Sequence, residues 1–197
     1  MGIVKNIFGR IWALWGLITF LITFLIIFIP SMCSHLMDEV KGQQYFIAVS
    51  KIWMNVWLFL VGCPVTVTGK EYFKKGESYI VVFNHNALLD VPLSAPYVPG
   101  ANKTIAKASF AKIPLFGAFY SRGSILVERK NEKSRSKSFD AMKKVLAKGM
   151  HMCIYPEGAR NRTAEPIKPF YDGAFRLATA TKKDIIPCVI SGTKKAM

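Results

Sequence analysis

Residues 79–90 read Tyr-Ile-Val-Val-Phe-Asn-His-Asn-Ala-Leu-Leu-Asp. The apolar run at the start, followed at once by polar residues, predicts a buried β-strand over 79–83. His85 and Asp90 stand just beyond the end of that strand. In a regular helix their spacing would separate the side chains by about 140°, and in a strand it would place them on opposite faces. The two side chains can therefore meet only if the chain turns between them.

A histidine and a carboxylate that meet in this way form a candidate acid–base pair. The imidazole takes a proton from an alcohol, while the carboxylate fixes the tautomer and stabilises the imidazolium. This is the chemistry needed to transfer an acyl group to a hydroxyl. The alternative is that His85 only bonds a backbone carbonyl at a strand end. The pair alone does not exclude that alternative, because short motifs often match by chance.

The rest of the chain after Gly62 has the pattern of an α/β domain. Further short buried strands are predicted at residues 65–68, 104–106, 124–127, 152–155 and 185–190. An amphipathic helix is predicted at 136–148 and another helix at 173–181, with a short helix between turns in 110–120 and a charged loop over 130–137. We find no internal repeat and no second globular domain.

The N-terminal part of the sequence is strongly apolar. Residues 11–34 carry no charge and are numerous enough to cross a bilayer core. A buried hairpin of a soluble protein is the alternative, whereas a cleaved signal peptide fits poorly because no small-residue cleavage site follows. Residues 45–61 contain one lysine and several aromatic residues. This second stretch either returns as another span or lies in the membrane interface as an amphipathic helix.

The positive charge of the chain is concentrated after its apolar N-terminal part. The net charge of the 197 residues is +15, and the first 69 residues hold four basic and two acidic residues, which leaves +13 on the remainder. A strongly basic domain joined to a lipid-seeking segment indicates an anionic membrane surface, an anionic substrate, or both. Nucleic acid is not expected as a partner, because no nucleic-acid-binding module is visible. The four cysteines lack metal-site spacing, so we expect reduced thiols and no metal.

Two further blocks strengthen the acyl-transfer hypothesis. Residues 122–129 read Arg-Gly-Ser-Ile-Leu-Val-Glu-Arg, and residues 155–162 read Tyr-Pro-Glu-Gly-Ala-Arg-Asn-Arg. With residues 84–90 before them and the proline-containing stretch 185–190 after them, these blocks resemble the glycerolipid acyltransferase family, especially its bacterial 1-acyl-glycerol-3-phosphate acyltransferases. The resemblance covers about residues 65–192. The ordered set of four blocks is far more specific than any one of them.

The resemblance implies a fold and a membrane attachment. Residues 64–197 are expected to form a single mixed-sheet α/β acyltransferase domain with flanking helices. Residues 1–63 are expected to form a two-helix membrane element that precedes it, with the catalytic domain on the cytoplasmic face of the inner membrane. Lys5 and Arg10 favour a cytoplasmic N-terminus. Family members usually continue beyond the proline strand, which leaves open a C-terminally truncated domain.

The resemblance also implies site residues. His85 would deprotonate the free hydroxyl of the acceptor lipid, with Asp90 as its support. The phosphate and glycerol of the acceptor would contact six residues: Lys107, Gly123, Arg129, Glu157, Gly158 and Arg160. Arginine suits phosphate because its planar fork donates two parallel hydrogen bonds. For Glu157 two roles stay open: it either positions an arginine or accepts from a glycerol hydroxyl, or it is purely structural.

The implied reaction moves an acyl group from acyl-CoA or acyl carrier protein to the sn-2 hydroxyl of lysophosphatidic acid, giving phosphatidic acid. The thioester is a co-substrate, and no metal or bound cofactor is expected. Ala159 and Asp172 depart from the usual family residues. Other acceptors therefore stay open, namely glycerol-3-phosphate, another lysophospholipid or an amino-lipid. A non-catalytic membrane protein that binds anionic lipid would explain the charge but not the ordered blocks.

Overall fold

The computed structural model describes residues 2–128 and 130–193. The helices of this part of the chain are α1 (Gly2–Met32), α2 (Glu39–Leu60), α3 (Asp90–Ser94), α4 (Phe116–Arg122), α5 (Glu132–Ala147) and α6 (Gly173–Thr181). The strands are β1 (Ile80–Phe83), β2 (Asn102–Lys107), β3 (Ser124–Val127), β4 (His151–Ile154) and β5 (Ile185–Cys188). Short 3-10 helices occupy Cys33–Leu36, Lys70–Tyr72, Ala95–Tyr97 and Ala108–Lys112.

The strands form one sheet in the order β3-β2-β4-β1-β5, and every pairing between the described strands is parallel. The α/β class is confirmed, but the expectation of a mixed sheet is wrong. The reason is that helical connections follow β1 through β4 and return the chain each time to the same edge of the sheet. All strands therefore end at one edge, where ligands bind in folds of this kind.

Strand β1, which lies between β4 and β5, is buried on both faces. Ile80 and Val82 face a cluster that includes Leu146 of α5 and Leu177 of α6. The alternate residues, such as Val81, pack in a second cluster on the other face. This two-sided burial explains why the strand reads as a continuous apolar run.

Three predicted segments differ from the structure. Residues 65–68 form no strand, because they are largely exposed and pair with no other strand in the described chain. The predicted loop at 130–137 is mostly the first part of α5, since the Asn131 side chain accepts from the Ser134 amide and caps a helix that begins at Glu132. The predicted helix in 110–120 is divided into two short helical segments.

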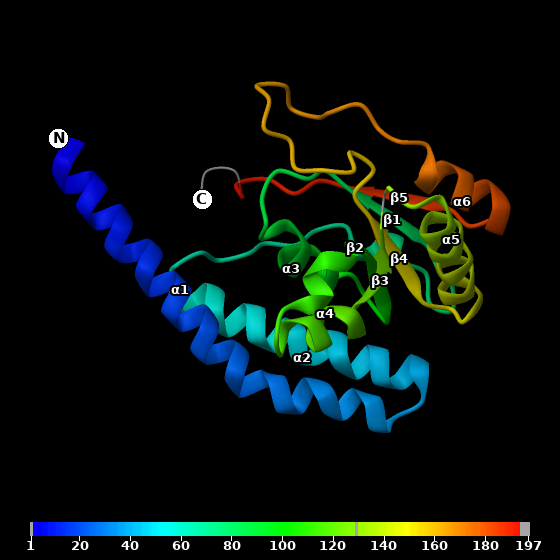
Figure 1. Ribbon diagram of the computed structural model, residues 1–197, viewed down its shortest axis with the longest axis horizontal. Coiled ribbons are helices and arrows are strands. Elements are labelled where there is room, and N and C mark those ends of the chain that lie inside the picture. Colours follow the sequence, from blue (N-terminus) through cyan, green and yellow to red (C-terminus); the bar gives the residue numbers. More distant parts are fainter. Residues whose placement is uncertain (1, 129, 194–197) are drawn as a thin grey trace.

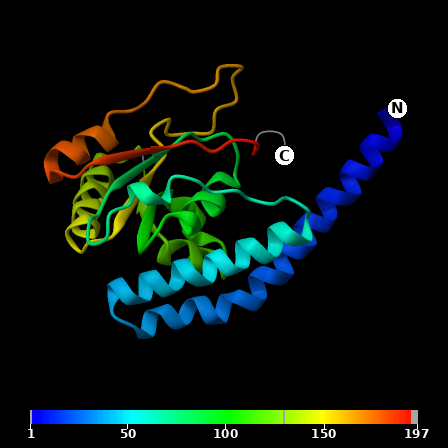
Figure 2. The same cartoon turned by 180° about the vertical axis from the view of Figure 1, so that it is seen from behind.

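The N-terminal helices α1 and α2 pack against each other and against α4 (Figures 1 and 2). Both views show the N-terminal part of α1 projecting beyond the end of α2. Only one described helical stretch, Asn6–Leu36, is long and apolar enough to cross a membrane. Only 11% of its most apolar part is buried inside the protein. The expected pair of helices is therefore present, but α2 is not a candidate span among the described helices.

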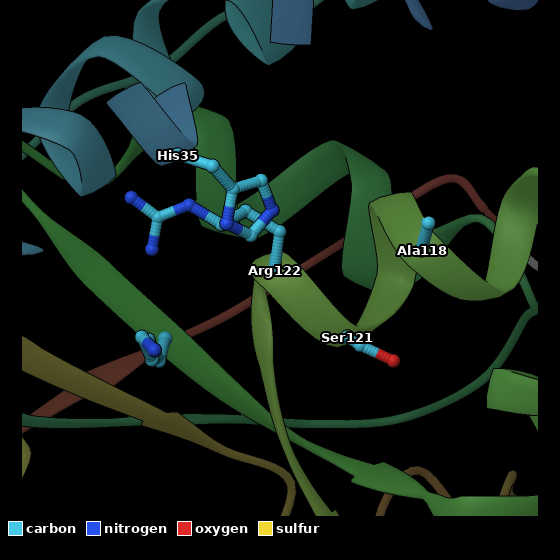
Figure 3. A pocket seen from close by; sticks show the side chains of 5 residues that line it. His35, Ala118, Ser121 and Arg122 are labelled. Carbon is cyan, nitrogen blue, oxygen red and sulfur yellow. The ribbon is translucent and has the colours of Figure 1, made fainter. Parts of the chain in front are cut away.

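A buried arginine ties the turn of this helical pair to the sheet. The Arg122 side chain, at the end of α4, donates to the Ser34 hydroxyl, the Ser34 carbonyl and the Gln43 side chain. Gln43 in turn donates to the carbonyl of Asn102 on β2, at 2.7 Å. Figure 3 shows the pocket beside this network, with His35 next to Arg122. The helical pair is thus joined to the α/β layer by polar as well as apolar contacts.

Candidate active site

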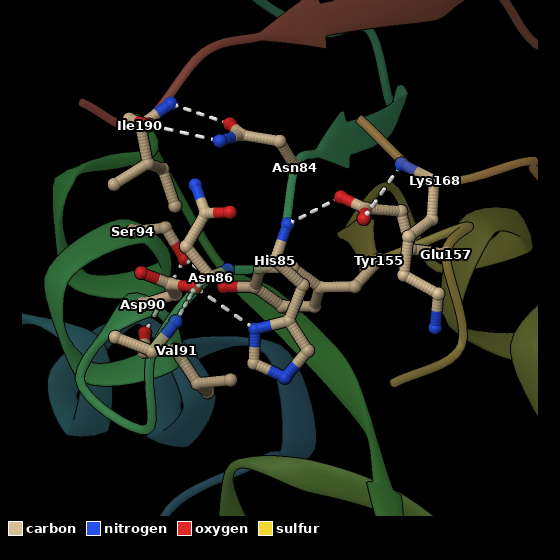
Figure 4. Close-up of polar contacts among 11 residues, drawn as sticks. Asn84, His85, Asn86, Asp90, Val91, Ser94, Tyr155, Glu157, Lys168 and Ile190 are labelled. Carbon is tan, nitrogen blue, oxygen red and sulfur yellow. Dashed lines mark hydrogen bonds and ion pairs between the residues drawn. The ribbon is translucent and has the colours of Figure 1, made fainter. Parts of the chain in front are cut away.

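The segment after β1 turns back on itself, as its sequence predicts. Asp90 is the first residue of α3, and its Oδ2 accepts from the backbone amides of Asn86 at 2.5 Å and Ala87 at 2.7 Å. The same oxygen lies 2.9 Å from Nδ1 of His85 (Figure 4). One carboxylate oxygen therefore closes the turn and holds the imidazole.

The environment of Asp90 favours its charged form. The residue is 0% exposed, and burial alone would raise the pKa of its carboxyl. Hydrogen bonds from His85, Ala87 and Asn86 oppose this effect, so that the pKa of Asp90 lies below its ordinary value. The Asp90 carboxylate is therefore ionised near neutral pH, and we assign the proton of the contact to Nδ1 of His85.

This tautomer leaves the lone pair of His85 Nε2 available to accept a proton. In Figure 4 the second ring nitrogen points away from Asp90, and within residues 2–128 and 130–193 it forms no hydrogen bond. The His85 side chain is 18% exposed, so a substrate hydroxyl can approach it. The pair can therefore act as a general base, with the carboxylate stabilising the imidazolium that forms.

Tyr155 packs against the His85 imidazole from the end of β4. The rings of His85 and Tyr155 lie 4.7 Å apart between centroids. The Tyr155 hydroxyl lies 2.5 Å from the Ser94 hydroxyl on α3. Burial raises the pKa of Tyr155 well above its ordinary value, although the contact with Ser94 acts in the opposite direction. The uncharged Tyr155 side chain thus lines one side of the site, a role that the sequence did not indicate.

Glu157 and Asn161 contact the backbone of His85. Oε1 of Glu157 accepts from the His85 amide at 2.7 Å, and Oε2 accepts from the Lys168 amide at 3.1 Å. The Asn161 amide donates to the His85 carbonyl at 2.6 Å. The sequence motif singled out Glu157 but not Asn161. Asn161 makes this contact through its backbone, so the identity of the side chain gives no indication of it.

Asn84 joins the end of β1 to the chain that follows β5. Its side chain donates to the Ile190 carbonyl at 2.9 Å and accepts from the Ile190 amide at 2.7 Å. The side-chain amide thus continues the ladder of hydrogen bonds between the two strands (Figure 4). This contact fixes the residue that immediately precedes His85.

The expected phosphate ligands are only partly placed. The exposed Lys107 is the last residue of β2, and the half-buried Arg160 follows β4, so both lie at the edge of the sheet formed by the carboxyl ends of the strands. Neither forms an ion pair with another described residue, so both cations are available to a phosphate. Gly158 has a φ of +68°, and a Cβ there would lie 2.7 Å from the Tyr171 ring, so only glycine fits. Arg129 lies outside the described residues.

Gly123 is placed differently from the other predicted site residues. It precedes β3, at the edge of the sheet opposite to the carboxyl ends of the strands. A Cβ at this position would lie 2.8 Å from the Phe46 ring of α2. The structure therefore does not bring Gly123 to the site, and the glycine instead allows close packing between α2 and the sheet.

Comparisons with known proteins agree with this fold. A sequence model of the family described as Acyltransferase matches residues 64–191, well over half of the chain. A 1-acyl-sn-glycerol-3-phosphate acyltransferase of Cocos nucifera is 31% identical over 71% of this chain and 45% of its own length. The enzyme of that name from Helicobacter pylori is 31% identical over 68% of this chain and 58% of its own length.

The crystal structure of the 1-acyl-sn-glycerophosphate (LPA) acyltransferase PlsC from Thermotoga maritima has the same fold. It superimposes with a TM-score of 0.77 at 23% identity, over 94% of this chain and 77% of that one. The chain spans about half the length of the curated relatives it matches. The fold and the histidine–aspartate pair define a class of parallel-sheet α/β proteins with a candidate acid–base pair at the carboxyl ends of the strands. The chain belongs to the acyltransferase family.

Proposed function

We propose that this protein transfers a fatty acyl group from a thioester donor to the sn-2 hydroxyl of 1-acyl-glycerol-3-phosphate, which yields phosphatidic acid. The observation that carries the proposal is the 2.9 Å contact between His85 Nδ1 and the buried Asp90 carboxylate, with Nε2 free of hydrogen bonds to the described residues. A thioester is already activated, so the reaction needs a base for the alcohol more than it needs a covalent nucleophile.

The proposed reaction balances without any further reagent. Nε2 of His85 removes the proton of the acceptor hydroxyl as its oxygen attacks the thioester carbonyl. The tetrahedral intermediate collapses with cleavage of the carbon–sulfur bond, and the departing thiolate takes the proton from the His85 imidazolium. The products are an ester and a free thiol, and the imidazole returns to its starting state.

The acceptor headgroup is assigned to the basic residues at the same edge of the sheet. Lys107 and Arg160 carry the cations that would bind its phosphate, and Arg129 belongs to the same sequence-based proposal. The relatives are named for the glycerol-3-phosphate ester, which supports this acceptor. Acyl-CoA and acyl carrier protein both remain in the proposal as donors, since either supplies the same thioester.

We assign residues 1–63 to membrane anchoring and residues 64–197 to catalysis. The outward side of α1 carries large apolar side chains with half or more of their surface exposed, such as Ile11, Ile26 and Ile29. Such an uncovered apolar surface fits a lipid environment. The net positive charge fits an anionic membrane surface, on the cytoplasmic face of the inner membrane in this proposal.

The test measures thioester consumption and product formation by the purified chain in mixed micelles with lysophosphatidic acid. Acyl-CoA and acyl carrier protein are supplied in separate reactions. The wild type is expected to form phosphatidic acid, whereas His85→Ala forms none and the exposed His35→Ala behaves as the wild type. Product with His85→Ala at the wild-type rate would contradict the assignment of the base.

The same assay separates the competing acceptors and the non-catalytic alternative. Glycerol-3-phosphate and lysophospholipids with larger headgroups replace lysophosphatidic acid one at a time. A preference for one of these would replace the proposed acceptor. A chain that binds anionic vesicles but consumes no thioester with any acceptor would instead be a lipid-binding scaffold.

A further inference from the structure

Glu157 is a buried carboxylate whose two oxygens are both engaged by the backbone. The residue is 1% exposed, and it forms no ion pair with another described residue. Its two hydrogen bonds come from amides that are far apart in the sequence, those of His85 and Lys168 (Figure 4). A buried charge is costly unless such bonds compensate it, so these contacts account for the presence of the carboxylate.

The same contacts leave Glu157 poorly suited to bind the acceptor. A hydroxyl that donated to Glu157 would have to reach an almost fully buried group whose oxygens already accept 2.7 Å and 3.1 Å hydrogen bonds. In addition, a carboxylate repels the phosphate that the neighbouring Arg160 would attract. The sequence left open that Glu157 accepts a hydrogen bond from a glycerol hydroxyl. Its burial and its existing hydrogen bonds argue against that contact.

We propose that Glu157 is a positioning residue, which fixes the backbone of His85 and couples it to the segment that carries Arg160. This proposal rests on the proposed function, because it gives His85 the role of the base. Glu157 holds the His85 amide, and the Asn161 amide holds the His85 carbonyl at 2.6 Å. Arg160 lies between these two contacts in the sequence. The phosphate-binding segment and the base are therefore held as one unit.

The test is the Glu157→Gln variant, which keeps the size of the side chain. Its amide oxygen can still accept one backbone N–H, but its NH2 group then faces the second donor. We expect kcat to fall tenfold to 100-fold, because a small displacement of a catalytic group has effects of that order. We expect the KM for the acceptor to stay within about threefold, because no contact with the acceptor is lost. The matched control is Glu165→Gln, an exposed carboxylate on the same segment.

A KM that rises tenfold or more with kcat preserved would overturn the proposal, because it would place Glu157 on the acceptor. Unchanged kcat and KM would overturn it as well. If Glu157→Gln cannot be purified as a folded protein, Glu157→Asp keeps the charge with a shorter reach. It is judged by the same two parameters.

A second readout does not depend on turnover. The chain has three histidines, so protein labelled with 15N-histidine gives only three backbone amide signals. Glu157→Gln should shift the His85 signal and speed its hydrogen exchange, while the signals of His35 and His151 stay in place. An unmoved His85 signal would overturn the proposal. A moved signal in a protein whose wild type transfers no acyl group would support the backbone contact and reject the proposed function.

Discussion

At the scale of single residues, the Asp90 carboxylate serves two purposes with one oxygen. It closes the turn by accepting the Asn86 and Ala87 amides, and it holds Nδ1 of His85. The first purpose needs only an acceptor, whereas the second needs a negative charge when the imidazolium forms. An amide in place of the carboxylate separates these two purposes.

Asp90→Asn is expected to fold with a similar thermal midpoint and to lose most of its turnover. The amide oxygen can still close the turn, but it cannot stabilise the imidazolium. We expect kcat to fall by about 10²–10⁴-fold, the range of general acid–base contributions. The measurement is steady-state turnover in micelles, with circular dichroism to compare the folds. A kcat within a few-fold of the wild type would contradict the role of Asp90.

His151 gives a prediction about pH and stability. It is buried, and its Nδ1 accepts from the Tyr79 amide at 3.1 Å. Burial lowers the pKa of His151, although a hydrogen bond to the Pro99 backbone acts in the opposite direction. Below the ordinary pKa of about 6.5, the unfolded chain therefore binds a proton more readily than the folded chain. The folded state should lose stability as the pH falls through that value.

We expect the free energy of unfolding by urea to decrease between about pH 7.5 and pH 5.5. His151→Gln keeps an acceptor for the Tyr79 amide but cannot be protonated, so it should show a smaller decrease over the same range. The exposed His35→Gln is the control and should keep the wild-type decrease. Equal decreases in His151→Gln and the wild type would assign the effect to other groups.

The sequence predicted one contact between the proposed site residues and missed others. The turn between His85 and Asp90 could be predicted because both residues lie in one short segment. The contact of Glu157 with the His85 amide could not, because it joins two strand ends that are 72 residues apart. The position of Gly123 was also misjudged, since its packing against Phe46 depends on how α2 lies on the sheet.

At the scale of elements, buried strands were predicted well and exposed segments poorly. The apolar runs at 79–83 and 124–127 match β1 and β3 closely because burial requires apolar residues. Residues 65–68 have a similar β-branched composition but find no partner strand. Strand pairing is a property of the whole sheet, so composition alone cannot decide it. The all-parallel pairing of the strands was not predicted either, because it depends on the path that the helical connections take over the sheet.

The packing of α2 against the turn after α1 requires a glycine. A Cβ at Gly42 would lie 2.3 Å from the Ser34 carbonyl oxygen and 2.7 Å from the Arg122 guanidinium. Gly42→Ala should therefore lower the free energy of unfolding by about 1–3 kcal/mol, the usual cost of overpacking. Gly9→Ala on α1 meets no neighbour within 4 Å, and it should not destabilise the protein.

Urea unfolding of both glycine variants in the same detergent tests this prediction. The polar network should weaken as well in Gly42→Ala, because the Arg122 guanidinium has to move. Equal stability of Gly42→Ala and Gly9→Ala would show that the turn tolerates the extra methyl group.

At the scale of the whole molecule, apolar surface and positive charge predict two separable contributions to membrane binding. The exposed isoleucines of α1 supply an apolar contribution that salt hardly affects, and the basic residues supply one that salt screens. Replacing both Ile26 and Ile29 by serine removes part of the first contribution only. Ile167→Ser is a control on the exposed segment between β4 and α6, which Figure 1 draws on the far side of the sheet from α1.

We expect the double variant to bind phosphatidylglycerol vesicles at least tenfold more weakly at high salt, since each buried isoleucine contributes about 1.5–3 kcal/mol. Ile167→Ser should bind as the wild type does. Vesicle flotation at low and high ionic strength gives both contributions. Unchanged binding of the double variant would mean that this side of α1 does not enter the lipid.

The four tryptophans of the chain all lie in α1 and α2. The indole groups of Trp12, Trp15 and Trp57 donate to backbone carbonyls across the helical pair, and that of Trp53 donates to the Thr23 hydroxyl. Tryptophan emission therefore reports on this helical pair and on its packing against α4, where Trp53 contacts Phe119. Followed beside the far-ultraviolet signal of the whole chain, it becomes an intrinsic optical label that shows whether the two parts of the molecule come apart together or in succession.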